Sequence, residues 1–239
     1  MAEAIAIEGL VFAYGRQRPP IFQSFDLSVA EGEVIVLVGP SASGKSTLLH
    51  LIAEHLTPQK GRIERSGPCL MIHQRDALLP WLTVRENIEF AKTYSLRGVS
   101  PDADSIVAGF NLSESMDLFP RELSGGLRQR VEVARAIIAG ANVLLMDEPF
   151  SALDAMTRSA VREETFKVLK RRGTTVVLVT HDLAEAAQVG ARVIVLAANP
   201  CRIQHDVLFP GTLPRAAASG DFIDGFSRLN QLTSEVVSE

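Results

Sequence analysis

The sequence predicts an α/β fold with a parallel sheet, an antiparallel β subdomain at the N-terminal end and an inserted helical subdomain. Three runs are apolar at every position, Val34–Val38, Val143–Met146 and Val176–Val179, which is typical of parallel strands covered on both faces. Helical spacing follows each run, as in repeated strand–helix units. Because ligands bind at the carboxyl ends of such strands, polar residues at those ends are the candidate site.

Two strands with one buried face are expected before the first of these runs. Residues Ile5–Phe12 and Phe25–Val29 alternate apolar and polar side chains, and Arg16–Pro20 between them has the composition of a turn. Tyr14 comes just after the first strand. On the residues alone, a tyrosine there suits either packing or stacking on a flat ring.

A glycine-rich loop joins the run Val34–Val38 to a helix. Its spacing of Gly39, Gly44, Lys45 and Ser46 is that of a phosphate-binding loop, in which backbone N–H groups converge on an anion. Lys45 is placed to reach the β- and γ-phosphates and Ser46 to bind Mg²⁺, which predicts a P-loop NTPase core; a plain glycine turn is the alternative. The loop comprises Gly39, Pro40, Ser41, Ala42, Ser43, Gly44, Lys45, Ser46 and Thr47.

Helical signals replace strand signals between about residues 75 and 123, which predicts the inserted subdomain. Thr83 and Glu86 form a capping box at the start of a helix. Its apolar face consists of Val84, Ile88 and Ala91.

A second glycine-rich helix end follows the insertion, at Ser124, Gly125 and Gly126. Its bare N–H groups, hydroxyl and positive dipole end favour an anion. One nucleotide does not obviously need two such ends, so this one is interpreted as completing a site in another copy of the chain. An ordinary N-cap at Ser124 is the alternative.

Carboxylates and a histidine end the two later apolar strands. Asp147 and Glu148 follow Val143–Met146, and His181 follows Val176–Val179. We expect Asp147 to bind Mg²⁺ together with the phosphate-loop serine, and Glu148 to orient or deprotonate an attacking water. Surface acids and a capping or solvated histidine are the alternatives.

The main domain is expected to span residues 1–209, and residues 210–239 to form a C-terminal linker and an amphipathic helix. Pro210 marks the linker, and Phe222 and Leu229 mark the apolar helix face.

Composition narrows the function. The 239 residues carry a net charge of −4, which gives no general attraction to nucleic acid or anionic lipid. Cys69 and Cys201 have no metal-type spacing, and no apolar run approaches the length of a membrane span. We therefore expect a cytoplasmic protein that reaches any membrane through a partner.

These segments, in this order, resemble the ATP-binding cassette (ABC) family over nearly the whole chain. Leu123–Arg130 is similar to the family's signature segment, Val143–Glu148 to its Walker B strand and Ser151–Asp154 to its D-loop. Gln74 stands at the Q-loop and His181 at the switch histidine.

The resemblance implies a head-to-tail homodimer that holds two ATP molecules with Mg²⁺. Each nucleotide would lie between Gly39–Thr47 of one copy and Ser124–Gly126 of the other. Tyr14 would stack on the adenine, and Asp154 would contribute to the nucleotide site through the D-loop.

The same resemblance implies the catalytic roles. Lys45 and His181 would contact the transferred phosphate, and Glu148 would be the catalytic carboxylate. Asp147 would hold the metal, and Gln74 would contact it and link the nucleotide state to a membrane partner.

Within the family, Asp76–Ile88 is most similar to the ATPases of importers for nitrate, sulfonate, taurine and related small solutes. Such a subunit works at the cytoplasmic face of the membrane with separate integral permease subunits and, indirectly, an extracytoplasmic solute-binding protein. No nucleic-acid partner is expected. A soluble ABC ATPase acting as an assembly factor, and an ATP-binding switch without turnover, remain alternatives. Leu78, Leu79 and Trp81 suit either a groove for a permease helix or the core of the insertion.

Three residues depart from the family pattern. Leu127 replaces a glutamine of the signature segment, and Ala42 and Cys201 stand where glycine is common. Ala42 is the expected place of backbone strain, because a β-carbon is costly where φ is positive. All the residues with catalytic roles are present, so hydrolysis is expected.

Overall fold

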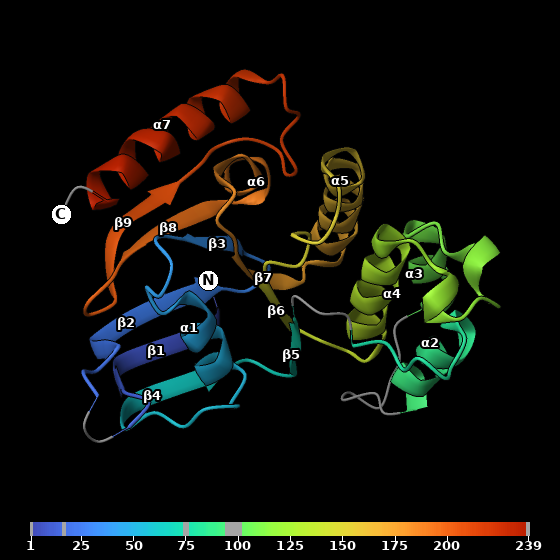
Figure 1. The fold of residues 1–239 in the computed structure, drawn as a ribbon, viewed down its shortest axis with the longest axis horizontal. Helices are drawn as coiled ribbons and strands as arrows, with labels where there is room; N and C mark the ends of the chain where they lie inside the picture. The colour runs from blue at the N-terminus through green and yellow to red at the C-terminus, as the bar shows by residue number, and fades with distance from the viewer. Residues whose placement is uncertain (1, 16–17, 74–76, 94–101, 238–239) are drawn as a thin grey trace. The chain divides into compact units, whose positions relative to one another are not determined.

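The computed structural model describes residues 2–15, 18–73, 77–93 and 102–237, which form two compact units (Figure 1). The first unit consists of Met1–Ser66 and Thr175–Glu239, and the second of Gly67–Thr174. The predicted insertion falls within the second unit. Gln74, one of the predicted site residues, lies outside the described residues.

The first unit begins with the predicted antiparallel sheet. Its strands β1 (Glu3–Phe12), β2 (Phe22–Ala30) and β4 (Lys60–Arg65) are ordered β2-β1-β4. Ile7 of the central strand pairs with Leu27 on one side and with Ile63 on the other. Burial alternates along β2, as expected for a strand with one covered face.

Parallel strands form the core of the same unit. They are β3 (Val34–Val38), β7 (Thr175–Val179) and β8 (Arg192–Ala197), with β9 (Arg202–Leu208) antiparallel to β8, in the order β7-β3-β8-β9. Val36 pairs with Leu178 and Val193. No residue of β3 is more than 2% exposed, which explains why its sequence is apolar at every position.

Three helices cover these strands: α1 (Lys45–Ile52), α6 (Leu183–Val189) and α7 (Gly220–Val237). α1 packs on β7, α6 on β3, and α7 on α6 and β8. Figure 1 shows α7, in red, running alongside β9 and β8. Leu229 is fully buried, so the predicted C-terminal amphipathic helix docks on the first unit through its apolar face.

The second unit contains the parallel strands β5 (Cys69–Ile72) and β6 (Val143–Asp147), in register at Leu70 and Leu144. Its α-helices are α2 (Val84–Thr93), α3 (Ala103–Gly109), α4 (Gly125–Ile138) and α5 (Ala155–Arg172), with 3₁₀ turns η1 (Ser113–Ser115) and η2 (Pro120–Glu122). α4 packs against the other three α-helices.

The start of α2 has the predicted capping box. The Glu86 carboxylate accepts from the Thr83 N–H at 2.7 Å, and the Thr83 hydroxyl accepts from the Glu86 N–H at 3.3 Å. Val84, Ile88 and Ala91 are buried as expected. Parallel strands, an antiparallel N-terminal sheet and inserted helices confirm the predicted α/β class. None of the described helices is both long enough and apolar enough to span a bilayer.

Candidate active site

The phosphate loop follows β3 and holds Lys45 over its own backbone. The Lys45 ammonium donates to the carbonyls of Gly39 at 2.8 Å and Pro40 at 2.7 Å, and to the Ser43 hydroxyl at 3.3 Å. The Lys45 residue is 9% exposed, so its charge is held at the loop rather than in bulk solvent. This places a cation where the phosphates of a nucleotide would approach the loop.

Two glycines in the loop leave no room for a side chain. A β-carbon on Gly39, whose φ is 152°, would lie 2.4 Å from the Leu196 carbonyl oxygen. One on Gly44, at φ 100°, would lie 2.8 Å from Ile21 Cγ2. Ala42 has φ 63°, which confirms the expected left-handed backbone at a cost of about 1–2 kcal/mol relative to an ordinary conformation.

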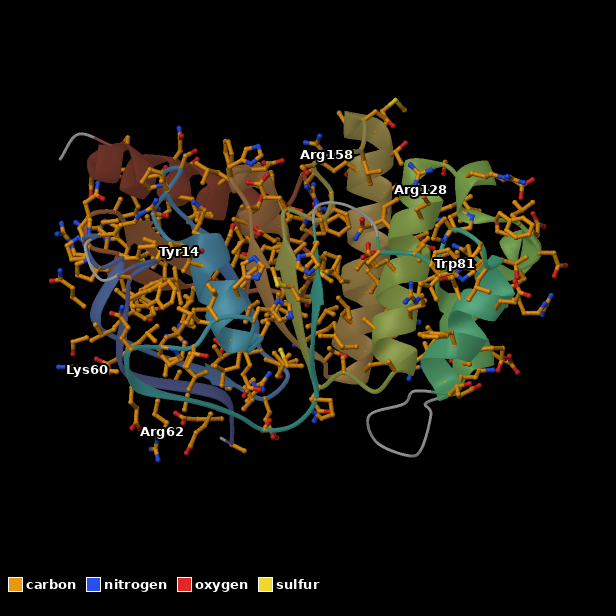
Figure 2. The ribbon with its side chains drawn as sticks, turned by 60° about the horizontal axis from the view of Figure 1, so that its bottom comes forward. Tyr14, Lys60, Arg62, Trp81, Arg128 and Arg158 are labelled. Atoms are coloured by element: carbon orange, nitrogen blue, oxygen red, sulfur yellow. The ribbon has the colours of Figure 1, made fainter. Side chains whose placement is uncertain are left out.

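Tyr14 lies beside the start of α1 (Figure 2). Its hydroxyl is 3.1 Å from the hydroxyl of Thr47, and its ring meets Phe12 edge-on at 5.1 Å between centroids. The Tyr14 residue is 52% exposed. The ring is therefore held at its edge and its tip while much of its surface stays available, an arrangement that suits stacking on a base.

His181 follows β7 and is exposed. It lines a cavity of about 190 Å³ next to the first residues of the phosphate loop; the lining residues are Val38, Gly39, Pro40, His181, Leu183, Val195 and Thr233. The first unit thus brings together the loop, the tyrosine beside it and the histidine, which come from distant parts of the sequence.

The second glycine-rich helix end forms as predicted, at the start of α4. The Ser124 hydroxyl accepts from the Leu127 N–H at 3.3 Å, so this serine is an N-cap. A β-carbon on Gly125 would lie 2.9 Å from Leu153 Cδ2, and one on Gly126 would lie 2.9 Å from Thr157 Cγ2. The glycines therefore also serve close packing of α4 on Leu153 and on the first turn of α5.

Asp147 is the last residue of β6 and Glu148 follows it, and both are partly buried. Glu148 has φ 48°, a left-handed conformation that costs a non-glycine residue about 1–3 kcal/mol. Its carbonyl accepts from the Ser151 N–H at 3.1 Å and from the Ser151 hydroxyl at 2.9 Å. The turn therefore fixes the backbone direction from which the Glu148 carboxylate extends.

The segment Ser151–Asp154 is braced by Arg158, which the sequence had not singled out. The Arg158 guanidinium donates to the Leu153 carbonyl at 2.7 Å and to the Ser151 carbonyl at 3.3 Å (Figure 2). Asp154 caps α5 by accepting from the Thr157 N–H at 3.1 Å, and hydrogen bonds from the side chain and then the backbone of Thr157 lower the pKa of Asp154. The sequence feature that could have indicated this role is the position of Arg158, four residues after the N-cap Asp154.

A magnesium site would need oxygen donors, and the predicted residues supply them. Ser46 is exposed at the start of α1, and Asp147 ends β6 in the other unit. Within the described ranges, no cluster of three or more His, Cys, Asp or Glu side chains forms a metal site by itself. Hydroxyl and carboxylate oxygens are donors of the kind that Mg²⁺ accepts beside nucleotide phosphates and water, so each of the two residues is chemically suited to this ion.

A polar network around Ala77 was missed by sequence reasoning. The Ala77 N–H donates to Glu132 at 3.1 Å, and its carbonyl accepts from Arg135 at 2.9 Å, both on α4. Asn87, which is fully buried, exchanges hydrogen bonds with the backbone of Leu79. A lone asparagine on the apolar face of α2 was the signal for it.

The three apolar residues whose role the sequence left open in this region differ in burial. Leu78 is 6% exposed and belongs to the core of the insertion, whereas Trp81 is 70% exposed (Figure 2). Leu79 is intermediate.

Known proteins share this combination of elements. Residues 22–151 match the family profile described as ABC transporter. The aliphatic sulfonates import ATP-binding protein SsuB of Bacillus subtilis (strain 168) is 36% identical over 230 residues, which cover 93% of this chain and 90% of that protein. The taurine import ATP-binding protein TauB of Jannaschia sp. (strain CCS1) is 37% identical over 199 residues, covering 79% and 74%.

A solved structure has the same fold. It is a dimeric ATP-binding cassette in a post-hydrolysis state, bound to ADP and Pi, with 26% identity and a TM-score of 0.71, covering 87% of this chain and 100% of that one. The fold and the phosphate loop define a P-loop ATPase. The chain belongs to the ABC transporter family, as one of its ATP-binding ATPase subunits.

Proposed function

We propose that this chain is the ATPase subunit of an importer for a small anionic solute, with sulfonates such as taurine as the first candidates and nitrate as the next. The observation that carries the proposal is the near full-length likeness to an aliphatic sulfonates import protein at 36% identity. The phosphate loop, the strand-end carboxylates and the glycine-rich start of α4 are all retained in this chain.

The residues have complementary roles in hydrolysis. Tyr14 stacks on the base and Lys45 binds the β- and γ-phosphates, while Ser46 and Asp147 hold Mg²⁺. The ion neutralises the phosphate oxygens when it is bound. Glu148 orients and deprotonates the attacking water, since a carboxylate at a strand end has the oxygen lone pairs that this needs.

The remaining predicted residues respond to the nucleotide. His181 contacts the γ-phosphate from the cavity beside Gly39, and Gln74 contacts the metal and reports the nucleotide state to the membrane partner. In a head-to-tail homodimer, Ser124–Gly126 of a second copy close over the same phosphates through free N–H groups and a helix dipole. The supporting observation is that α4 starts with two glycines behind a serine cap.

An apolar pocket of about 260 Å³ in the second unit supports docking on permease subunits. β5, α2 and α4 line it, with Phe90 and Ala77 among the residues and Glu132 and Arg135 in its wall. Phe90 is 41% exposed, and Trp81, on the loop before α2, adds a second exposed aromatic side chain. An exposed aromatic side chain in the wall of an apolar pocket, as Phe90 is here, is typical of a surface that binds a protein segment, and we assign that segment to a permease helix.

Purification from detergent-solubilised membranes tests the importer function. We expect the tagged chain to recover an integral membrane protein, and the double variant Trp81→Ala/Phe90→Ala to recover much less of it. Leu208→Ala is the matched control, because Leu208 is another exposed apolar residue, at 72%, in the first unit. Recovery of soluble proteins alone would contradict the importer and favour an assembly factor.

Growth experiments test the solute. A strain lacking this chain should fail to grow on taurine or an alkanesulfonate as the only sulfur source, and should recover when the chain is restored. Normal growth on sulfonates together with failure on nitrate as the only nitrogen source would assign the other solute class.

A further inference from the structure

The linker before α7 contains a buried arginine that the proposed hydrolysis does not use. Arg215 is 3% exposed. Its guanidinium donates to four carbonyls at 2.8–2.9 Å, those of Ala187, Gly190, Phe209 and Pro210. Few side chains can satisfy so many acceptors at once, because only guanidinium offers five N–H donors in a fixed plane.

Three of the carbonyls that Arg215 binds belong to the C-terminal end of α6. Its side chain donates to the carbonyls of Ala187 and Gly190, and its backbone N–H donates to the carbonyl of Gln188 at 2.8 Å. The last carbonyls of a helix have no partner within the helix and carry the negative end of its dipole, so a cation is favoured there. Burial lowers the pKa of Arg215, and the nearby Asp221 carboxylate opposes this effect.

The other end of α6 is fixed next to His181. Asp182, the following residue, accepts from the N–H groups of Ala184 at 2.9 Å and Glu185 at 3.2 Å, and its own N–H donates to the Thr180 hydroxyl. α6 has only seven residues, too few to be stable without such contacts. The position of this short helix, and of the histidine that precedes it, thus depends on what holds its two ends.

The C-terminal segment also lines the cavity that His181 lines. Thr233 of α7 shares the cavity of about 190 Å³ with His181, Gly39 and Pro40. Gly225 of the same helix packs close to Phe209 and Ala187. α7 and its linker therefore contact α6 at its C-terminal end and the cavity beside its N-terminal end.

We propose that Arg215 is a positioning residue for ATP hydrolysis. By holding the C-terminal end of α6, it sets the place of His181 beside the first residues of the phosphate loop. This inference rests on the proposed contact of His181 with the γ-phosphate. It makes residues 210–237 part of the catalytic unit rather than an appended tail.

Steady-state kinetics of the full-length chain with Mg²⁺ and ATP test the proposal. Arg215→Met should lower kcat about tenfold, since small displacements of a positioned group have effects of this order, and should leave KM for ATP within about twofold. Arg215→Lys should recover only part of kcat, because an ammonium keeps the charge but cannot bind four carbonyls. Arg228→Met is the matched control, an exposed arginine on α7, and should behave as wild type.

A double-variant cycle separates positioning from general destabilisation. If Arg215 acts through His181, Arg215→Met should cause no further loss of kcat in a His181→Ala background. An equal loss in both backgrounds, or wild-type kcat in the single Arg215→Met variant, would overturn the inference. If Arg215→Met does not fold, as judged by its thermal melt, Arg215→Lys carries the same cycle.

A different measurement tests the proposed role of His181. Wild-type kcat in His181→Ala would remove that role, and with it the route from Arg215. If only the inference about Arg215 is wrong, His181→Ala should still lower kcat, whereas Arg215→Met should leave kcat unchanged.

Discussion

The hydroxyl of Tyr14 lies 3.1 Å from the hydroxyl of Thr47, the last residue of the phosphate loop. This contact joins the end of β1 to the first turn of α1 across 33 positions of sequence. It places an exposed aromatic ring at a defined distance from the loop that would hold the phosphates. A nucleotide bound by the loop would therefore have a stacking surface for its base already in place.

Substitutions of Tyr14 should separate stacking from hydrogen bonding. Tyr14→Ala is expected to raise KM for ATP about tenfold, because stacking a base on an aromatic ring contributes about 1–3 kcal/mol. Tyr14→Phe keeps the ring and should change KM less than about threefold. Equal KM values for the two variants would show that the ring does not stack on the base.

Glu148→Gln should abolish turnover while ATP still binds. Loss of a general base lowers kcat by about a hundredfold or more, and an amide of the same shape leaves the phosphate loop untouched. Phosphate release and the binding of a fluorescent ATP analogue are the two measurements. Glu163→Gln is the control, because Glu163 is a half-exposed glutamate on α5 that pairs with Lys167 on the same helix. Turnover that persists in Glu148→Gln would identify another base or favour the non-hydrolysing switch.

Gly126→Ala should destabilise the second unit, since the new methyl group would lie 2.9 Å from Thr157 Cγ2 and 3.0 Å from Val161 Cγ2. Overpacking of this kind costs about 1–3 kcal/mol. At this chain length each kcal/mol lowers Tm by about 2–4 °C. Gly109→Ala is the matched control, because its β-carbon meets only Val168, at an ordinary 3.5 Å. A Tm for Gly126→Ala equal to that of the control would mean that α4 and α5 move apart easily.

Cys201 should be unreactive in the folded protein. Burial raises the pKa of this thiol from 9.0 to about 12. At pH 8 only about one thiol in ten thousand would then be ionised, and the thiolate is the reactive form. In a Cys69→Ser background, Ellman's reagent should detect no fast thiol at pH 8 and one thiol after unfolding. Rapid reaction of the folded protein would contradict the burial.

The same shift predicts a loss of stability at alkaline pH. The folded state favours the neutral Cys201 thiol, so its contribution is complete below the ordinary pKa of 9.0 and is lost as the pH rises towards 12. Cys201→Ser should therefore show a smaller fall in Tm between pH 8 and pH 10 than the parent chain.

Local sequence was sufficient for the elements and for most of the candidate site. The fully apolar run Val34–Val38 predicted a strand covered on both faces, and Thr83 with Glu86 predicted the start of α2. These features depend on residues that are close together in the chain, so they can be predicted from the local sequence. The roles assigned to His181 and Glu148 stay predictions that the experiments above test.

Sequence reasoning missed the polar groups whose partners are distant. Arg215 gives no local sign that it will be buried, and its acceptors near residue 190 are about 25 positions away. Arg135 holds the loop after residue 76 in the same way, because its acceptor, the Ala77 carbonyl, is 58 positions away in the sequence. Likewise, Leu78 and Trp81 could not be distinguished from the sequence, because both are apolar residues of a predicted loop. Only their exposed fractions in the structure separate them.

The sequence alone determined the order of strands, loops and helices, the phosphate loop and the family to which the chain belongs. Each of these depends on residue type and spacing over a few turns of chain. Only the tertiary structure decided that Glu148 adopts left-handed backbone, that the Tyr14 ring is held beside Thr47, and that α7 reaches the cavity of His181. These outcomes depend on contacts between segments far apart in the chain, where packing and hydrogen bonding outweigh the preferences of any single residue.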